Sequence, residues 1–484
     1  MTTRRKTQTR SRDDRRNADP LIGQVVGEPE PERRERLKRP PAGSAPEATP
    51  AAPRNVLEML RRGPMGVLRV LGPGLITGAS DDDPSGIGTY SQVGSQFGYG
   101  LLWTALFTFP LMTAMQELCG RIALQTGVGL GVSLRRKFPT WLVTICIGGL
   151  VVANTINIGA DLGAIAAGGE LLSRGVVKAF WLVLPAALLI LGLQLFGTYQ
   201  RIFDTFKWLT LALFAYVVTA FFTHADVGQV LRATFIPHVE TSPAFVAALV
   251  AVLGTTISPY LFFWQASSEV DEMQAAGQTT EAERRGVKRS ELGAARIDIV
   301  TGMLFSNVVM YFIILTTATV LHGHGKSGIQ TAADAASALQ PLAGPFASLL
   351  FAAGLIGTGL LGVPILSGSA AYAVKELLRL PGGLQDKPRY RPVFYLVIVA
   401  ATLIGVAFNF LRVDPIRALF ITSLINGLLA PPLLILIVLL GSDRRVMEHR
   451  ASGLLSRTLT WAAALIMSAA AVALLVTSLA PIHG

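Results

Sequence analysis

Three consecutive aspartates lie inside a stretch that otherwise has the composition of a membrane-spanning helix. The segment from Gly72 to Tyr90 reads GPGLITGASDDDPSGIGTY, so Asp81, Asp82 and Asp83 come directly before a Pro-Ser-Gly break. Ionisable side chains at membrane depth are costly unless they face other helices or water, and unwound backbone is tolerated there only inside protein or along a cavity. Carboxylate and carbonyl oxygens are ligands of hard divalent cations. The segment therefore predicts a cation site at a broken helix.

A second interruption lies in a later apolar stretch, which reads AVLGTTISPYLFFWQASSEVDE. Pro259 follows Ser258 near its middle, and a proline there removes one helical hydrogen bond and frees carbonyls upstream. Interrupted spans at corresponding positions of two halves are typical of the substrate site of an inverted-repeat transporter. The two halves share no evident sequence identity, so the repeat is predicted from topology and from the two breaks.

The composition is that of a membrane protein. Of 484 residues, 51% are hydrophobic and only 15% are charged, and the mean hydropathy is +0.50; soluble proteins carry about 25% charged residues. The net charge is +11, and between the apolar blocks the basic residues lie in short loops, which indicates membrane topology rather than nucleic-acid binding. Cys119 and Cys146 lie in apolar segments and predict neither a disulfide nor a thiolate metal site. We expect the lipid bilayer and a cation as partners, with no nucleic acid and no required protein partner.

The chain divides into a tail and a transporter domain. Residues 1–60 are charged and proline-rich, which predicts a disordered cytoplasmic tail, and residues 61–484 form the predicted domain. Eleven apolar spans are expected at about 66–92, 98–124, 140–168, 179–198, 204–224, 243–268, 297–321, 345–374, 393–411, 416–441 and 457–481. The first repeat runs over about 66–224 and the second over about 243–441, with 457–481 as an extra span.

The distribution of basic residues predicts the orientation. With the N-terminus in the cytoplasm, the internal loops together hold far more lysine and arginine than the external loops, as in Arg135-Arg136-Lys137 and Arg284-Arg285. Arg201 and Lys207 fall in another internal loop. The C-terminus is then outside, and the compact loops suggest the inner membrane of a bacterium.

Several segments resemble one transporter family. GPGLITGASDDDPSGIGTYSQVGSQFGYGLLW is similar to the first span of the Nramp divalent metal transporters and the entry to their second, and MQELCGRIALQTG to the end of the second. GADLGAIAAG resembles the third span of that family and RIDIVTGMLFSN the seventh. The resemblance runs from about Leu71 through the tenth span. It implies an all-α integral membrane protein with a LeuT-like fold, two inverted five-helix repeats and an eleventh span. It also implies a metal held between broken spans one and six and moved by alternating access.

The motifs depart from the usual family pattern in the first and third spans. The Asp-Pro-Gly-Asn motif appears as Asp83-Pro84-Ser85-Gly86, so the metal-binding aspartate is kept and the asparagine is lost. The Asp-Leu-Ala-Glu motif appears as Asp161-Leu162-Gly163-Ala164, which keeps only the acid at its start.

The sixth span departs further. Met-Pro-His becomes Ser258-Pro259-Tyr260, and a second histidine of the family aligns with Gln265. These losses resemble the Nramp-related branch that lacks the metal-binding methionine and carries magnesium or manganese. A thioether favours softer metals, whereas oxygen ligands suit Mg²⁺ and Mn²⁺.

The predicted site is built almost entirely of oxygen. Its expected metal contacts are Asp83, Ser80, Gly86, Thr255, Ser258 and Asn426. Asp83 supplies the carboxylate, Ser80 and Thr255 mark carbonyls, and Gly86 leaves room for the waters that Mg²⁺ retains. The residues expected around the site or on a proton path are Asp82, Asp161, Tyr260 and Gln265. Asn157 and Asn307 are interpreted as interhelical hydrogen-bond partners.

These residues predict a secondary transporter of Mn²⁺, Mg²⁺ or both, with no cofactor. Tyrosine and glutamine do not titrate near pH 7, so we expect uniport rather than proton coupling. The alternatives are a proton-coupled Mn²⁺/Fe²⁺ symporter of the usual family type, and an organic-solute or amino-acid symporter on the same fold. A gated channel and a metal-sensing membrane protein are weaker alternatives. No nucleophile–base pair, P-loop or metalloprotease motif predicts an enzyme.

Overall fold

The computed structural model describes residues 77–78, 80–197, 211–223, 225–411 and 413–479. Every described residue belongs to one compact unit, which lies within Pro50–Gly484. Four predicted segments lie outside the described residues. They are the tail, the first part of span one at 66–76, the loop with Arg201 and Lys207, and the beginning of span five.

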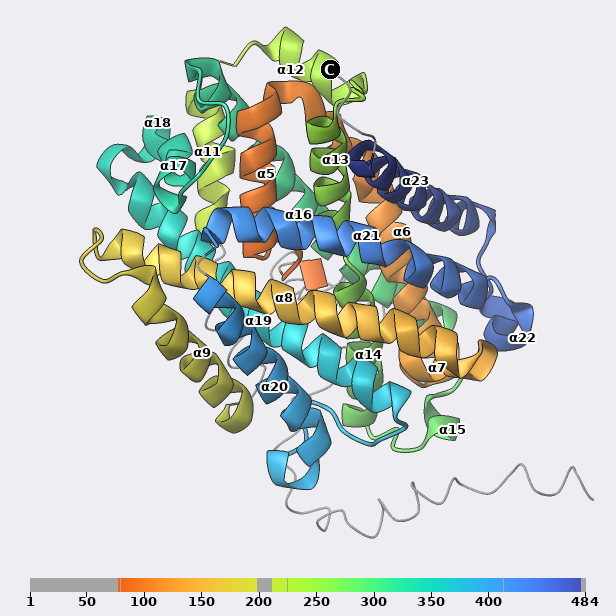
Figure 1. The fold of residues 1–484 in the computed structure, drawn as a ribbon. Coiled ribbons are helices and arrows are strands. Elements are labelled where there is room, and N and C mark those ends of the chain that lie inside the picture. Colours follow the sequence, from red (N-terminus) through yellow and green to blue (C-terminus); the bar gives the residue numbers. More distant parts are fainter. Residues whose placement is uncertain (1–76, 79, 198–210, 224, 412, 480–484) are drawn as a thin grey trace, which may run out of the picture. The chain divides into compact units, whose positions relative to one another are not determined.

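The described residues form helices joined by turns, without a strand (Figure 1). The longer helices are α5 (Pro84–Phe97), α6 (Trp103–Thr126), α8 (Thr140–Leu172), α9 (Ala179–Phe196), α11 (Phe214–Phe222), α12 (Val227–Phe235), α13 (Pro243–Thr256), α14 (Pro259–Ala275), α16 (Arg289–Val320), α19 (Ala347–Leu377), α20 (Pro392–Phe408), α21 (Pro415–Gly441) and α23 (Leu454–Leu479). Shorter helices are α7 (Leu130–Lys137), α15 (Glu281–Arg284), α17 (Ala332–Ala336), α18 (Gln340–Ala343) and α22 (Arg444–Met447), with 3₁₀ turns η1 (Gly98–Leu101) and η3 (His322–His324) among them.

Eight helices of the described part are long and apolar enough to cross a membrane. The number becomes nine if Pro84–Leu101 and Trp103–Thr126, which meet at 107°, are taken as one broken span. Helices α13 and α14 together count as one span over Pro243–Ala275, despite the break between them. The chain is thus an all-α, multi-pass membrane protein, as predicted. The expected total of eleven stays a prediction, because spans one and five begin outside the described residues.

The broken segments lie among the longest helices. Helix α5 packs on α13, α16 and α21, while α8 packs on α19, α20 and α21 and also contacts α5 (Figure 1). Glycines allow the closest crossings: a Cβ on Gly254 of α13 would lie 2.1 Å from the Ser423 carbonyl oxygen of α21. Small residues at such crossings are typical of helix packing in membranes.

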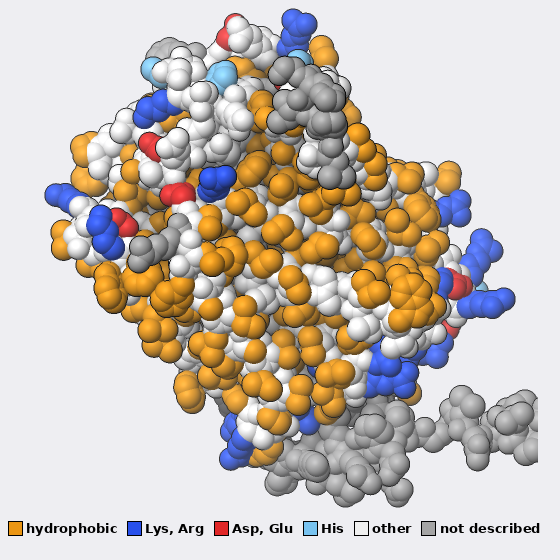
Figure 2. Space-filling view, viewed as in Figure 1, with side chains coloured by type: hydrophobic (Ala, Val, Ile, Leu, Met, Phe, Trp, Pro, Cys, Tyr) orange, Lys and Arg blue, Asp and Glu red, His pale blue; other side chains and the backbone are white. Residues whose placement is uncertain are grey.

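The lateral surface is apolar. Figure 2 shows hydrophobic side chains over the middle of one face, with lysine and arginine towards its margins. Trp181, Phe196 and Phe221 are 71%, 90% and 79% exposed, an arrangement suited to lipid contact and costly in water.

Candidate metal-binding site

Asp83 occupies the break in the first span. Pro84 opens α5, and the residue before a proline favours extended backbone, which Asp83 adopts with φ −64° and ψ 170°. Its Oδ1 atom accepts hydrogen bonds from the Gly86 amide at 3.0 Å and the Ser85 hydroxyl at 2.5 Å. The carboxylate therefore caps the helix that follows the break.

The other carboxylate oxygen of Asp83 connects two further helices. Oδ2 accepts a hydrogen bond from Asn157 Nδ2 on α8 at 3.1 Å and one from the Tyr260 hydroxyl on α14 at 3.0 Å. The same hydroxyl lies 3.3 Å from the Ser80 carbonyl oxygen. Asp83 is only 1% exposed. Four donors thus surround a buried carboxylate at the point where the broken spans and α8 meet.

The second break lies beside the first. Helix α13 ends at Thr256, and α14 begins at Pro259 after Ile257 and Ser258. The Ser258 hydroxyl lies 2.9 Å from the Gly254 carbonyl oxygen and 2.6 Å from that of Thr255, so its single hydrogen points back along α13. Its lone pairs remain available to a cation.

Gly86 lies where the two breaks come close together. A Cβ on Gly86 would lie 3.2 Å from Tyr90 Cε2 and 3.4 Å from both the Asp81 carbonyl oxygen and Thr255 Oγ1. The Thr255 hydroxyl is itself 3.5 Å from the Ser85 hydroxyl. Any side chain at position 86 would therefore enter the space between the broken spans.

Asn426 lies on α21, the helix that packs on both α5 and α13. One turn earlier, the Ser423 hydroxyl lies 3.4 Å from the Ser85 carbonyl oxygen and accepts a 2.8 Å hydrogen bond from Thr89. Asn426 is 3% exposed, and its Nδ2 has no hydrogen-bond partner among the described residues. The fold thus brings Asp83, Ser80, Gly86, Thr255 and Ser258 together, while Asn426 is near them without a hydrogen bond to Asp83.

Helix α8 presents buried acceptors beside Asp83. Asp161 is fully buried, and within the described part no side chain donates a hydrogen bond to either of its carboxylate oxygens. A Cβ on Gly362 of α19 would lie 3.0 Å from the Asp83 Cβ and 3.6 Å from Asp161 Oδ2, so both acids flank this glycine. Asn157, one turn before Asp161, is also fully buried with an unpaired Oδ1.

Asn157 is the site residue that sequence reasoning missed. The expected contact between helices exists, but the partner of its side chain is the predicted metal ligand itself. Its spacing of four from Asp161, which puts both on one face of a helix, was the available signal.

Asp81 and Asp82 turn away from this centre towards α16. The Ser306 hydroxyl lies 2.6 Å from Asp81 Oδ2 and 3.1 Å from Asp82 Oδ1. Asp81 Oδ1 and Asp82 Oδ2 have no hydrogen-bond partner among the described residues. The three aspartates therefore do not converge on one point, as expected for consecutive residues at a helix end.

Gln265 belongs to a polar chain that begins beside the first break. The Thr77 hydroxyl donates to Gln265 Oε1 at 2.7 Å, and Gln265 Nε2 donates to Glu269 Oε1 at 3.0 Å. The chain runs along α14 and contains an amide where a titrating relay would need an acid or a histidine.

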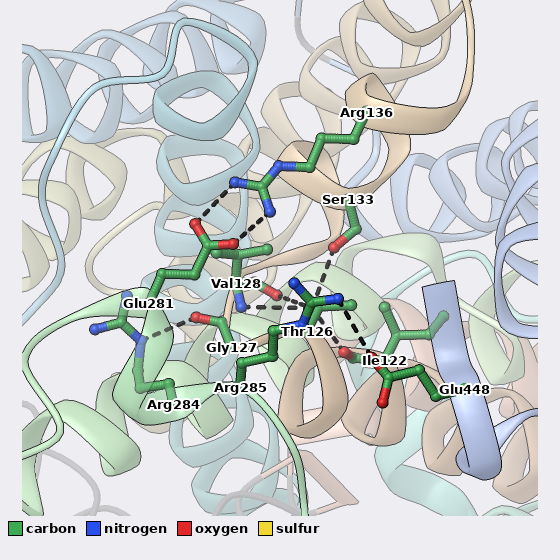
Figure 3. Close-up of polar contacts among 10 residues, drawn as sticks. All are labelled: Ile122, Thr126, Gly127, Val128, Ser133, Arg136, Glu281, Arg284, Arg285 and Glu448. Carbon is green, nitrogen blue, oxygen red and sulfur yellow. Dashed lines mark hydrogen bonds and ion pairs between the residues drawn. The ribbon is translucent and has the colours of Figure 1, made fainter. Parts of the chain in front are cut away.

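Polar contacts hold together one end of the helix bundle. At this end, which we call the basic end and define by α7, α14, α15 and α22, Arg136 forms a paired contact with Glu281 at 2.5 and 2.8 Å (Figure 3). Arg284 donates to the Gly127 carbonyl at 2.9 Å, and Arg285 lies 3.3 Å from Glu448 (Figure 3). These contacts join α6, α7, α15 and the turn after α22.

Deeper at the basic end, Glu376 of α19 ties α7 to α14. It accepts hydrogen bonds from the Gly131 amide at 2.7 Å and the Ser267 hydroxyl at 3.0 Å. At the opposite end, Phe97 packs edge-on against Phe245 with ring centroids 5.4 Å apart. These contacts and the burial of Asp83 describe a site that is closed in this structure.

The donor set fits a hard cation that keeps part of its water shell. Within the described ranges, no three histidine, cysteine, aspartate or glutamate side chains converge as a metal-binding group. One carboxylate with neutral oxygens around it matches the way Mg²⁺ is usually bound, through one or two carboxylates and several waters. A site of this kind needs no sulfur.

Known membrane transporters are similar to this chain along most of its length. A family model described as natural resistance-associated macrophage protein-like, Nramp, matches residues 74–477. The divalent metal cation transporter MntH of Deinococcus radiodurans is 25% identical over 416 residues, which cover 84% of this chain and 90% of that protein. MntH of Yersinia pestis is 28% identical over 299 residues, or 60% of this chain and 69% of the relative.

Solved structures share the fold. A single-site mutant of the Eremococcus coleocola manganese transporter superposes with a TM-score of 0.66 at 16% identity, over 87% of this chain and 89% of that one. The nucleobase-cation-symport-1 transporter Mhp1, closed with bromovinylhydantoin bound, gives 0.52 at 15% identity over 88% and 95%. The fold is LeuT-like, as predicted. With a family model matched across most of its length, the chain belongs to the Nramp family.

Proposed function

We propose that this protein transports divalent metal cations, Mn²⁺ and Mg²⁺, by alternating access, with the ion held between the two broken spans. The observation that carries the proposal is the buried Asp83 carboxylate at the meeting point of α5, α8 and α14. The adjoining face of α8 carries the unpaired Oδ1 of Asn157 and the Asp161 carboxylate, to which no described side chain donates a hydrogen bond. Buried acceptors of this kind are costly without a partner, and a cation would supply one.

The chemistry of the ligands favours hard ions. Asp83 is the charged ligand, and Ser80, Thr255, Ser258, Gly86 and Asn426 supply or leave room for neutral oxygens. Ser258 replaces a thioether with a hydroxyl, so selectivity for softer metals falls and Mg²⁺ becomes acceptable. The relatives named as manganese or divalent metal cation transporters support Mn²⁺ as the second ion.

We further propose uniport driven by membrane potential. Tyr260 donates to Asp83 and Gln265 lies in an amide-linked chain, so neither supplies a proton relay near pH 7. Two charges crossing about 100 mV release about 5 kcal/mol, which is a sufficient drive.

The orientation in the membrane is proposed from the distribution of lysine and arginine among the loops. We place the N-terminus and the basic end in the cytoplasm and the C-terminus outside, in a bacterial inner membrane. Residues 1–60 would then form a cytoplasmic tail beside two inverted five-helix repeats and a final span.

The test is uptake of Mn²⁺ and Mg²⁺ into proteoliposomes that contain a pH probe, for wild type and Asp83→Ala. We expect uptake of both ions without acidification, and its loss in the variant. Uptake by Asp83→Ala at the wild-type rate would refute the site, and absence of wild-type uptake would refute the function.

A proton-coupled symporter is the second candidate, favoured by one observation. Asp161 is a buried carboxylate to which no described side chain donates a hydrogen bond, and it lies across Gly362 from Asp83. Acidification that accompanies Mn²⁺ uptake and disappears in Asp161→Asn would establish this mechanism. An organic-solute symporter shares the fold, but Asp83 would repel a substrate carboxylate.

A further inference from the structure

We propose that Asn157 is a ligand of the transported cation, contributed by α8, and that its carboxamide rotates between the empty and the loaded site. In the empty site Nδ2 donates to Asp83 Oδ2; in the loaded site Oδ1 faces the ion or one of its waters. This inference rests on the proposed function, since it names a further ligand of the same site.

The Asp83 carboxylate already accepts as many hydrogen bonds as it has lone pairs. Each carboxylate oxygen has two lone-pair sites, and each already accepts two hydrogen bonds. A cation can bind this carboxylate only if at least one donor leaves. The Gly86 amide is fixed by α5, so the donors that can leave are the side chains of Ser85, Asn157 and Tyr260.

Asn157 differs from Ser85 and Tyr260 because its side chain is a carboxamide and not a hydroxyl. A serine or tyrosine hydroxyl that turns away from Asp83 has another acceptor within reach, Thr255 Oγ1 at 3.5 Å for Ser85 and the Ser80 carbonyl oxygen at 3.3 Å for Tyr260, but it only withdraws a hydrogen from the carboxylate. The carboxamide of Asn157 carries a donor and an acceptor on one carbon, so rotation about its last bond exchanges Nδ2 for Oδ1 in place. The rotation removes a hydrogen from Asp83 and supplies an oxygen that suits Mg²⁺ or Mn²⁺.

The carboxamide oxygen of Asn157 is buried and unpaired in the described part of the chain. Asn157 has 0% exposure, and its Oδ1 has no hydrogen-bond partner among the described residues. A buried amide oxygen without a partner is unfavourable, and a cation or one of its waters would pair it. The same amide has its nitrogen 3.1 Å from Asp83 Oδ2, so the unpaired oxygen lies at the site rather than elsewhere on α8.

A neighbour on the same helix provides a matched control. Asn154 is equally buried, and its Nδ2 donates to the Leu366 carbonyl oxygen at 3.1 Å. Its Oδ1 is also unpaired in the described part, but the hydrogen bond directs this amide to α19 and not to Asp83.

The experiment titrates the purified full-length protein with Mn²⁺ and follows free Mn²⁺ by electron paramagnetic resonance. Variants are Asn157→Leu, Asn157→Asp, Asn154→Asp and Asp83→Ala, each checked by gel filtration and thermal unfolding. We expect Asn157→Leu to weaken binding by about tenfold, which is the scale for losing a supporting contact at a metal. Asn157→Asp, which keeps an oxygen but has no donor, should bind at least as tightly as wild type.

The outcomes separate the two proposals. Unchanged affinity in Asn157→Leu overturns the ligand role. Weakening in Asn157→Asp as large as in Asn157→Leu also overturns it, because Asn157 would then act only by donating to Asp83. A gain in Asn154→Asp equal to that in Asn157→Asp would reveal a general effect of added charge and likewise overturn it. Wild-type affinity in Asp83→Ala would instead refute the proposed site.

Discussion

At the scale of single residues, the donors around Asp83 compete with the cation for the same lone pairs. The Tyr260 hydroxyl occupies one site on Oδ2 at 3.0 Å. Tyr260→Phe removes this competitor and leaves the ring in place. We predict a lower KM for Mn²⁺ uptake, by up to about tenfold, since a hydrogen bond to a charged group contributes about 1.5 kcal/mol.

The control for this prediction is Tyr216→Phe on α11. Tyr216 is fully buried, and its hydroxyl faces the Ser91 hydroxyl rather than a carboxylate, so the change removes an oxygen without freeing a carboxylate. Its KM should match wild type. A higher KM in Tyr260→Phe would mean that the hydroxyl positions Asp83 or touches the ion.

At the scale of elements, the break in the sixth span depends on close packing of α13 against α21. A Cβ on Gly254 would lie 2.1 Å from the Ser423 carbonyl oxygen and 2.4 Å from the Gly427 amide nitrogen, and neither backbone atom can move alone. Gly254→Ala should lower the thermal unfolding temperature in detergent and slow transport, because overpacking costs about 1–3 kcal/mol.

Gly192→Ala is the matched change. Gly192 lies within α9, and nothing lies within 4 Å of the position of an added Cβ. Alanine favours a helix over glycine, so stability should be unchanged or slightly higher. Equal losses in both variants would show that the crossing at Gly254 has no special role.

Elements also explain which parts of the site could be predicted. Asp83 and Ser258 were accessible to sequence reasoning because each break is local: an acid or hydroxyl residue directly precedes a helix-opening proline. Asn157 was not, because α8 is 33 residues long and apolar on several faces. The packing of α8 on α5 and α19 decides which polar residue of α8 meets Asp83, and no local sequence pattern encodes that packing.

The direction of Asp81 and Asp82 towards Ser306 could not be predicted for the same reason, because it depends on tertiary packing.

At the scale of the whole molecule, transport requires that one end of the site opens while the other stays closed. The contact between Arg136 and Glu281 joins α7, which precedes α8, to α15, which follows α14, and these two short helices must separate if the basic end opens (Figure 3). Hydrogen bonding to Arg136 lowers the pKa of Glu281. A carboxylate with a lowered pKa stabilises the closed state above its ordinary pKa, and this contribution is lost only as the pH falls through the lowered value.

We therefore predict that Glu281→Gln opens the basic end more often, by up to about fivefold, because an exposed ion pair contributes at most about 1 kcal/mol. The measurement is the rate at which a polar thiol reagent labels Val270→Cys on α14, in a chain with Cys119→Ala and Cys146→Ala. The ratio of the Glu281→Gln rate to the parent rate should stay constant from about pH 6 to 8, where Glu281 is ionised throughout.

Glu448→Gln is the control. It removes the longer 3.3 Å contact with Arg285, in which both side chains are more than half exposed, and should leave labelling unchanged. Equal labelling of parent and Glu281→Gln would overturn this prediction and mean that other contacts, such as those of Glu376 and Arg284, hold this end closed.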